Sequence, residues 1–150
     1  MACLGSALLL SSCGGPVEVE APRLTGADER TCRRLVQALP DSVDDAERVE
    51  VDPPEAPAGA WGDPPIVLRC GVPMPEDFDD YATCHETNGI GWFIPDEQMS
   101  GEATEITMTT IGRDVNVEVT LPPEHWPPAN AMVDLSEAID ATTDEVDPCV

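Results

Sequence analysis

The chain has 150 residues, with 30 Asp and Glu against seven Lys and Arg, for a formal net charge of −23 at pH 7. Such an acidic surface repels nucleic-acid phosphate and anionic lipid headgroups, which excludes DNA or RNA as a partner. A hydrophobic content of 41% with 16 Pro and 11 Gly indicates one small folded domain with long loops rather than a disordered chain.

The N-terminus has the pattern of an export signal. An apolar run, Ala7–Leu10, leads through two serines into Cys13. A short apolar segment closed by small residues is typical of secretory signals, and a cysteine directly after Leu-Ser-Ser is the residue that bacterial lipoproteins acylate. We therefore predict a signal peptide over residues 1–12 and palmitate-type lipid on Cys13.

Two alternatives to this signal remain open. Residues 1–13 contain no Lys or Arg, whereas export signals carry basic residues before the apolar stretch, so the true start is expected upstream or the N-terminus is internal. A buried or membrane-spanning helix is disfavoured because the apolar run is about ten residues long, against roughly 20 for a span.

Residues 13–24 are predicted to be the acylated cysteine and a flexible acidic tether that reaches at most roughly 35 Å. Residues 25–150 are predicted to form a single domain. Because an acidic body does not adhere to an anionic membrane by charge, attachment depends on the acyl chains alone. We expect the protein to be exported and held on the outer face of the cytoplasmic membrane.

The first predicted helix begins at Thr25–Asp28, which resembles a capping box, and ends at Pro40. Its apolar face is formed by residues at helical spacing, namely Cys32, Leu35, Val36 and Leu39.

Strands are predicted next. Their signals are alternation, β-branched residues and a Gly112-Arg113 turn, and the segments are Arg48–Val51, Ile66–Cys70, Ile90–Ile94, Thr104–Ile111 and Asp114–Leu121. The proline-rich stretch 52–65 and the acidic stretch 71–86 are predicted to be loops.

A second helix is predicted after Pro127-Pro128, with a buried stripe of Met132, Leu135, Ala138 and Ile139. The predicted fold class is α+β, an antiparallel sheet of four to five strands with an N-terminal and a C-terminal helix on one face, stabilised by disulfides.

Cysteine usage agrees with export. Once Cys3 is removed with the signal and Cys13 carries lipid, four cysteines remain, Cys32, Cys70, Cys84 and Cys149, with three possible pairings. We favour Cys70 with Cys84, closing a loop of about 15 residues worth roughly 3 kcal/mol, and Cys32 with Cys149. A zinc site is the alternative, but the chain has no CxxC or HxxxH spacing, so we expect no metal and no cofactor.

Catalytic motifs are missing from the sequence. It contains no GxSxG, P-loop, HExxH or GxGxxG, and His85 and His125 are its only histidines. For Cys84 and His85 to act as nucleophile and base, a Cys84 thiolate would have to contact the His85 ring in the fold. A disulfide at Cys84 would remove that thiolate. The acids Glu76, Asp77, Asp79 and Asp80 lack the glycine and the distal glutamate of a calcium loop, so they predict a solvated face.

One constellation suggests a ligand groove. Two indoles and two guanidiniums, from Trp61, Arg69, Trp92 and Arg113, are suited to a sugar or an anionic group by stacking and bidentate hydrogen bonding. The alternative, which burial statistics favour, is that each Trp fills the core and each Arg pairs with a local carboxylate.

Three stretches resemble a known family. Residues 60–71 (AWGDPPIVLRCG), residues 88–92 (NGIGW) and residues 111–122 beginning Ile-Gly-Arg are similar to the actinobacterial family of exported lipoproteins known as domain of unknown function 3515. The resemblance covers nearly the whole chain after the tether. It implies an envelope location and four disulfide-forming cysteines, and it brings no activity, cofactor or catalytic residue.

Two functions follow as expectations. The first is a lipid-anchored, non-enzymatic binding or scaffolding module with an envelope protein or glycan as partner. The second is an envelope hydrolase acting on peptidoglycan or glycan, which needs two carboxylates about 5 to 10 Å apart in a cleft. A deep pocket with converging acids would favour the hydrolase, and an open groove without them would favour the binding module.

Overall fold

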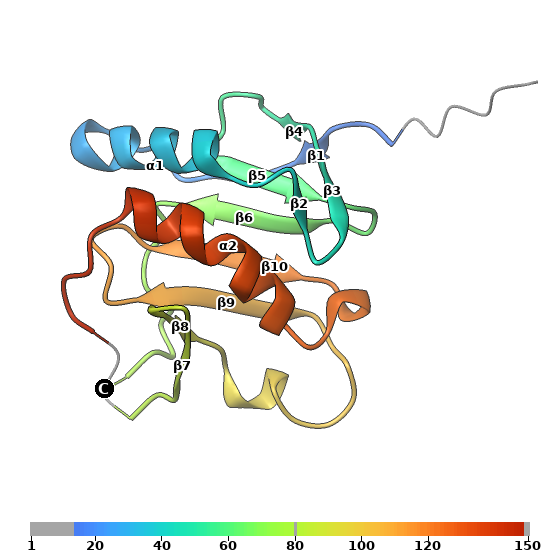
Figure 1. Cartoon of the computed structure of the whole chain (residues 1–150), viewed down its shortest axis with the longest axis vertical. Helices are drawn as coiled ribbons and strands as arrows, with labels where there is room; N and C mark the ends of the chain where they lie inside the picture. The colour runs from blue at the N-terminus through green and yellow to red at the C-terminus, as the bar shows by residue number, and fades with distance from the viewer. Residues whose placement is uncertain (1–13, 80, 149–150) are drawn as a thin grey trace, which may run out of the picture.

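The computed structural model describes residues 14–79 and 81–148, so the predicted signal, Cys13, Asp80 and Cys149 lie outside the described residues. Within them, one large antiparallel sheet of eight strands runs in the order β2-β3-β5-β6-β10-β9-β8-β7 (Figure 1). Its strands are β2 (Ser42–Val43), β3 (Ala46–Val49), β5 (Ala58–Trp61), β6 (Ile66–Cys70), β7 (Cys84–Thr87), β8 (Ile90–Phe93), β9 (Ile106–Ile111) and β10 (Val117–Leu121).

Two α-helices, α1 (Gly26–Ala38) and α2 (Ala129–Thr142), pack on the same face of this sheet. Leu35 of α1 and Leu135 of α2 share one core cluster with Ile66 and Leu68 of β6, and all four are fully buried. Short 3₁₀ helices, η1 (Asp96–Gln98) and η2 (Pro123–His125), lie in the connections. The α+β class is confirmed, with eight strands in the sheet instead of four to five.

The alternating segments form the centre of the sheet. β6 spans the predicted residues, and β9 and β10 pair as the predicted hairpin, with Val119 opposite Met108. Val117, Val119 and Leu121 are all buried on one face, as period-2 alternation requires. The predicted stripe of α2 is also buried.

Two strands lie in stretches that we predict to be loops. β5 pairs with β6 although its residues, Ala-Gly-Ala-Trp, are buried at every position and show no alternation. β7 pairs with β8 through a two-residue turn at Asn88 and Gly89, with φ values of 50° and 79°. An Asn-Gly pair with positive φ at both positions is the most favourable two-residue hairpin turn, so the signal for β7 was present in the sequence.

Helix α1 has no side-chain cap at its N-terminus and is capped at its C-terminus by a residue from another element. Thr25 is its N-cap, as predicted, but its side chain makes no capping hydrogen bond. The C-terminal turn has no basic residue of its own. Arg48 of β3 instead donates to the main-chain oxygens of Val36 (3.0 Å) and Leu39 (3.2 Å), placing a positive charge where the helix dipole is negative.

The disulfide pairing differs from the predicted one. Cys32 of α1 is bonded to Cys70 at the end of β6, with an S–S distance of 2.00 Å. Both residues are fully buried where α1 crosses the sheet, because Cys32 lies on the inner helix face and Cys70 follows Ile66 and Leu68 on the same strand face. Cys84 is also disulfide-bonded. The proposed Cys70–Cys84 and Cys32–Cys149 pairs are therefore wrong.

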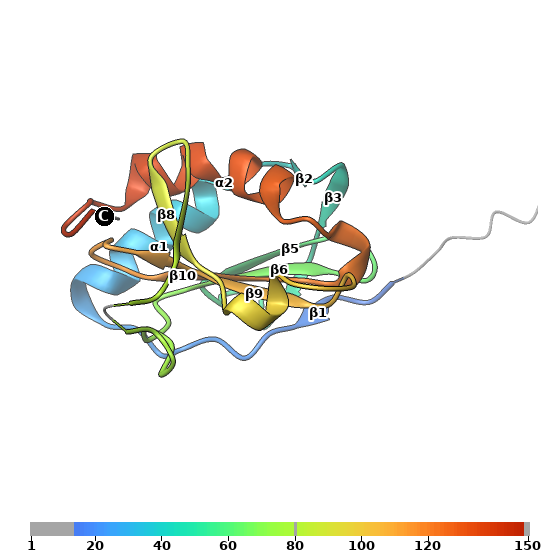
Figure 2. The ribbon, with the colours of Figure 1, turned by 90° about the horizontal axis from the view of Figure 1, so that it is seen from below.

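The segment predicted to be a flexible tether is docked on the domain over most of its length. We call residues 17–24 the strap. Its first residues form β1 (Val17–Glu18), which pairs in parallel with β4 (Val51–Asp52). Val19 is 8% exposed and packs with Ala56 and Ala58. Figure 2 shows the strap running beneath the sheet, on the side away from α2.

Candidate functional site

The four residues of the predicted Trp–Arg groove do not lie together. Trp61 and Trp92 are fully buried in the core on the helix side of the sheet, and the Trp61 indole donates to the Pro40 oxygen (3.0 Å). Arg69 lies on β6 and pairs with Glu118 on β10. The alternative interpretation, that the tryptophans fill the core, is the one that the structure supports.

Arg113 is a buried structural cation rather than a ligand group. Its guanidinium donates to the oxygens of Thr143 (3.1 Å) and Gly89 (3.3 Å) and to the Asp140 carboxylate (3.0 Å). These bonds join the β9–β10 turn to the end of α2 and to the β7–β8 turn. With only 3% of its side chain exposed, Arg113 is fully engaged.

Neither histidine forms a nucleophile–base pair among the described residues. His85 follows Cys84 along β7, where neighbouring side chains point to opposite faces, and Cys84 is disulfide-bonded. His125 accepts or donates a 2.7 Å hydrogen bond through Nδ1 to Asp44, which also accepts from Asn130 at 2.8 Å. No hydroxyl or thiol within the described ranges is hydrogen-bonded to His125.

The Asp44 carboxylate has a shifted pKa. Its partial burial acts to raise the pKa, but hydrogen bonds from Asn130 and His125, together with the charge of His125, outweigh burial and lower the pKa below its usual value. The charged form of Asp44 is therefore the one that the fold stabilises. Sequence analysis did not find this pair, since Asp44 and His125 are 81 residues apart.

The acidic cluster shows local structure only. Asp79 accepts a hydrogen bond from the main-chain N–H of Tyr81 (2.9 Å), and Glu76 and Asp77 are exposed. In residues 14–79 and 81–148, no group of three or more His, Cys, Asp or Glu is placed to hold a metal ion. Neither helix in these ranges has the length and hydropathy needed to cross a bilayer.

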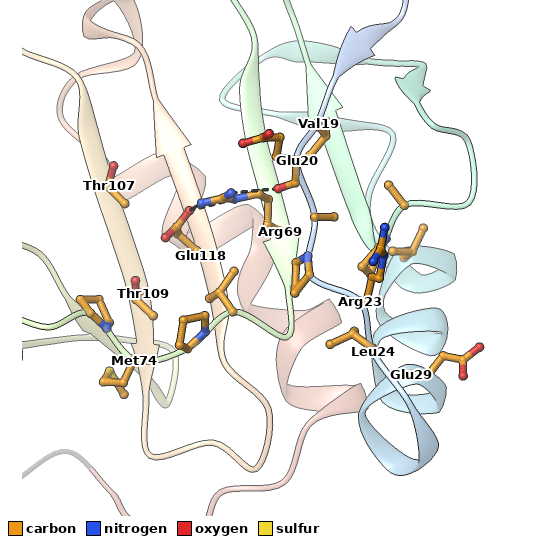
Figure 3. Close-up of a pocket in the computed structure, with 18 of the residues that line it drawn as sticks. Val19, Glu20, Arg23, Leu24, Glu29, Arg69, Met74, Thr107, Thr109 and Glu118 are labelled. Carbon is orange, nitrogen blue, oxygen red and sulfur yellow. Dashed lines mark hydrogen bonds and ion pairs between the residues drawn. The ribbon is translucent and has the colours of Figure 1, made fainter.

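A large groove, with a cavity volume of about 1540 Å³, lies on the sheet face away from α2 and extends to α1, whose Glu29, Arg33, Val36 and Gln37 also line it. Its floor is formed by outward-facing residues of β6, β10 and β9 (Figure 3). One wall is the strap together with the Pro53–Pro57 loop, and the other is the segment Val72–Asp77 with Phe93 and Pro95. Chain segments from five parts of the sequence therefore meet around it.

The floor carries one neutralised charge pair and two threonines. Arg69 donates through Nε (3.0 Å) and Nη2 to one Glu118 oxygen and through Nη1 to the main-chain oxygen of Glu20 in the strap (2.9 Å). Thr107 and Thr109 lie beside this pair on β9 (Figure 3). Thr109 is 1% exposed, and its hydroxyl has no hydrogen-bond partner. A buried hydroxyl without a partner costs about 1–3 kcal/mol.

The walls are rich in proline, and the exposed charges are mostly acidic. The prolines are Pro22, Pro53, Pro54, Pro57, Pro73, Pro75 and Pro95. Four exposed acids have no ion-pair partner within the described ranges, and they are Glu20, Glu55, Glu76 and Asp77. Of the three arginines that line the described groove, Arg33 and Arg69 are paired with Glu29 and Glu118, and Arg23 has no ion-pair partner in residues 14–79 and 81–148.

Of the residues proposed for a groove from the sequence, only Arg69 lines this one. The groove escaped sequence analysis because its wall was interpreted as a tether and its floor consists of ordinary strand residues. The available signal was the recurrence of prolines at positions 22, 53–57 and 73–75, which become neighbours only in the fold.

Comparison with known proteins gives one match. A family model described as "Protein of unknown function (DUF3515)" matches residues 2–148. No curated protein and no solved structure matches the chain.

Proposed function

We propose that this chain, which belongs to the DUF3515 family of proteins of unknown function, is a lipid-anchored binding module of the cell envelope that holds its partner in the groove and catalyses no reaction. The observation that carries this proposal is the groove itself. It is long and open, and its floor consists of hydroxyl groups and a self-neutralised ion pair. Those groups suit recognition rather than bond cleavage.

The hydrolase alternative lacks support in the groove. A glycosidase needs two carboxyl groups facing each other across the substrate, one of them protonated. Glu118 is the acid on the floor, and its carboxylate is paired with the Arg69 guanidinium. The other acids of the described groove lie exposed on its walls.

The anchor is proposed from Leu10-Ser11-Ser12-Cys13 and from the net charge of −23, which rules out attachment of the body by charge. Detergent-phase partitioning of the native protein and a Cys13→Ser variant tests it. We expect the native protein in the detergent phase and the variant in the aqueous phase. Both proteins in the aqueous phase would refute the anchor.

The binding site is tested with a photo-crosslinking amino acid placed in the intact membrane-attached protein. We expect position Thr107, on the groove floor, to give a discrete adduct with an envelope protein or glycan. Val133, which is 50% exposed on α2, is the matched control position. Equal adducts at both positions, or none at Thr107, would remove the groove from the proposal.

Turnover is measured separately with purified peptidoglycan and glycan fragments. We expect none. Turnover that disappears in a folded Glu118→Gln variant would replace the binding module by the hydrolase.

A further inference from the structure

We propose that the groove binds an extended peptide segment that carries positive charge. This inference rests on the proposed function, since it names the ligand class of the same groove. It follows from the size of the groove, the open main chain of its walls, the unpartnered Thr109 hydroxyl and the sign of the surrounding charge.

The groove is larger than a typical small-molecule site, and both of its walls offer main-chain groups to which a peptide could bind. Its volume of about 1540 Å³ exceeds the roughly 300–1,000 Å³ typical of small-ligand pockets. Along the strap, residues 21–24 make no hydrogen bond to other main chain within the described ranges, and the same holds for Pro73 and Met74 in the opposite wall. A peptide lying between the walls would meet free main-chain groups on both sides.

Thr109 supplies an independent sign of a ligand. Thr109 lines the groove and pairs across the sheet with Glu118 on one side and Phe93 on the other, and its hydroxyl is buried without a partner. A hydroxyl both donates and accepts a hydrogen bond, and the main chain of a peptide offers both complements. Burying such a hydroxyl unpaired is unfavourable, and a ligand group that bonds it removes that cost.

The groove is rich in acceptors and poor in donors. Proline has a carbonyl acceptor but no N–H, so seven lining prolines remove donors from the walls. Glu20, Glu55, Glu76 and Asp77 add carboxylate acceptors without ion-pair partners in the described chain, against one unpaired cation, Arg23. The best complement is a ligand that supplies donors and positive charge, and the field of a protein with charge −23 favours its approach.

A glycan fits the groove less well. Phe93 is the aromatic residue that lines it, and its ring is packed against Phe78 in an edge contact with centroids 5.4 Å apart and planes at 75°. The two fully buried tryptophans face the other side of the sheet. The described walls therefore offer no free flat ring on which a sugar could stack.

The test uses a fluorescein-labelled decapeptide of alternating lysine and alanine, with the whole exported protein and fluorescence anisotropy as the readout. We expect saturable binding that weakens with salt, and no binding of the matched glutamate–alanine peptide. Thr109→Val should weaken binding by about fivefold, the value of one hydrogen bond, without lowering protein stability. Glu76→Gln/Asp77→Asn should also weaken it by about fivefold.

The control is Glu124→Gln/Glu137→Gln, which makes the same charge change at exposed positions that do not line the groove. Equal weakening by both double variants would mean non-specific attraction to an acidic protein and would overturn the proposal. Complete displacement by spermine at equal charge would show that any polycation suffices and would also overturn it. If Thr107 crosslinks an envelope partner while the lysine–alanine peptide does not bind, the ligand class is wrong and the binding function stands.

Discussion

Asp44 joins three parts of the chain through a single residue. Its carboxylate bonds His125 at 2.7 Å and Asn130 at 2.8 Å, and its main-chain N–H donates to Asp134 at 2.8 Å. With φ at 47°, it adopts a left-handed conformation that Asp and Asn tolerate better than other L-residues. Asp44 thereby holds the β2–β3 turn against η2 and the start of α2.

We predict that Asp44→Asn lowers the free energy of unfolding at pH 7 by about 1 kcal/mol, because a charged hydrogen bond to His125 is lost while the backbone conformation is kept. The folded state lowers the pKa of Asp44, so its contribution is complete above the unfolded pKa of about 3.9 and is lost as the pH falls through the folded pKa. Urea unfolding of both proteins from pH 7 to pH 3 should show the difference shrinking below about pH 4.

Asp45→Asn is the control for this measurement. Asp45 is exposed and has a similar φ of 61°, with no ion-pair partner among the described residues. A difference that is the same size for both variants, or that stays constant with pH, would contradict the assigned role of Asp44.

Gly112 is required by its surroundings as well as by its backbone. Its φ is 68°, and a Cβ at this position would collide with the main-chain oxygen of Asp147. Gly89 has a φ of 79° but open space around it. We predict that Gly112→Ala costs more than 2 kcal/mol and Gly89→Ala about 1 kcal/mol, since only the first adds a clash to left-handed strain. If both variants lost the same free energy of unfolding in urea, the main chain at Asp147 would be able to move away from the added methyl group without destabilising the fold.

Among the elements, the α1–β6 junction is closed covalently. The Cys32–Cys70 bond spans a sequence separation of 38 residues. For a loop of this length the chain-entropy model gives about 4 kcal/mol, so the Cys32→Ala/Cys70→Ala variant should lose about that much in non-reducing urea unfolding. A loss below about 1 kcal/mol would mean that core packing alone holds α1 on the sheet.

The second disulfide can be assigned by mapping. Because Cys32 and Cys70 are bonded to each other and Cys84 is also disulfide-bonded, we predict Cys149 as the partner of Cys84 in a mature chain whose Cys13 carries lipid. Non-reducing peptide mapping of exported protein should yield a Cys84–Cys149 peptide beside the Cys32–Cys70 peptide. A peptide that joins Cys84 to Cys13 would refute both the assignment and the anchor.

The elements that sequence predicted well are those whose burial alternates. β6, β10 and α2 each have one buried face, so apolar periodicity marks them. β5 is buried at all four positions and contains small residues between prolines, so it has no period to detect. The short pairing of β1 with β4 depends on contacts between segments 34 residues apart along the sequence, such as Val17 with Val51, which local patterns do not encode.

The candidate site was less predictable for the same reason. The candidate ligand residues were chosen by residue type, but their roles depend on burial. Trp61 and Trp92 are fully buried and belong to the core. Thr109 is unremarkable in the sequence and becomes notable only because the fold leaves its hydroxyl buried without a partner. The groove walls are loops from distant parts of the sequence. Loops have no apolar period, so only the fold shows that these segments are neighbours.

At the scale of the whole molecule, the strap has two roles. It forms one wall of the groove, and it continues directly toward the predicted anchor at Cys13. Its docking depends on Val19 in the second core cluster and on the bond from Arg69 to the Glu20 oxygen. Loosening the strap should therefore open the groove wall as well.

We predict that Val19→Asp increases the rate of limited trypsin cleavage after the exposed Arg23 by about tenfold, because a buried charge shifts the strap toward its undocked state. Val133→Asp, at a half-exposed position of α2, should leave that rate unchanged. Rapid cleavage after Arg23 in the unaltered protein would show that the strap is not held.

The docked strap also sets the working distance of an anchored molecule. If Cys13 is acylated, only four residue steps separate it from Val17, the first paired residue, which is a reach of about 13 Å at about 3.3 Å per residue. A tether this short keeps the groove close to the bilayer surface. A partner that is itself embedded in that bilayer would then meet the groove at an effective concentration in the millimolar range, so a weak intrinsic affinity would be enough to keep it occupied.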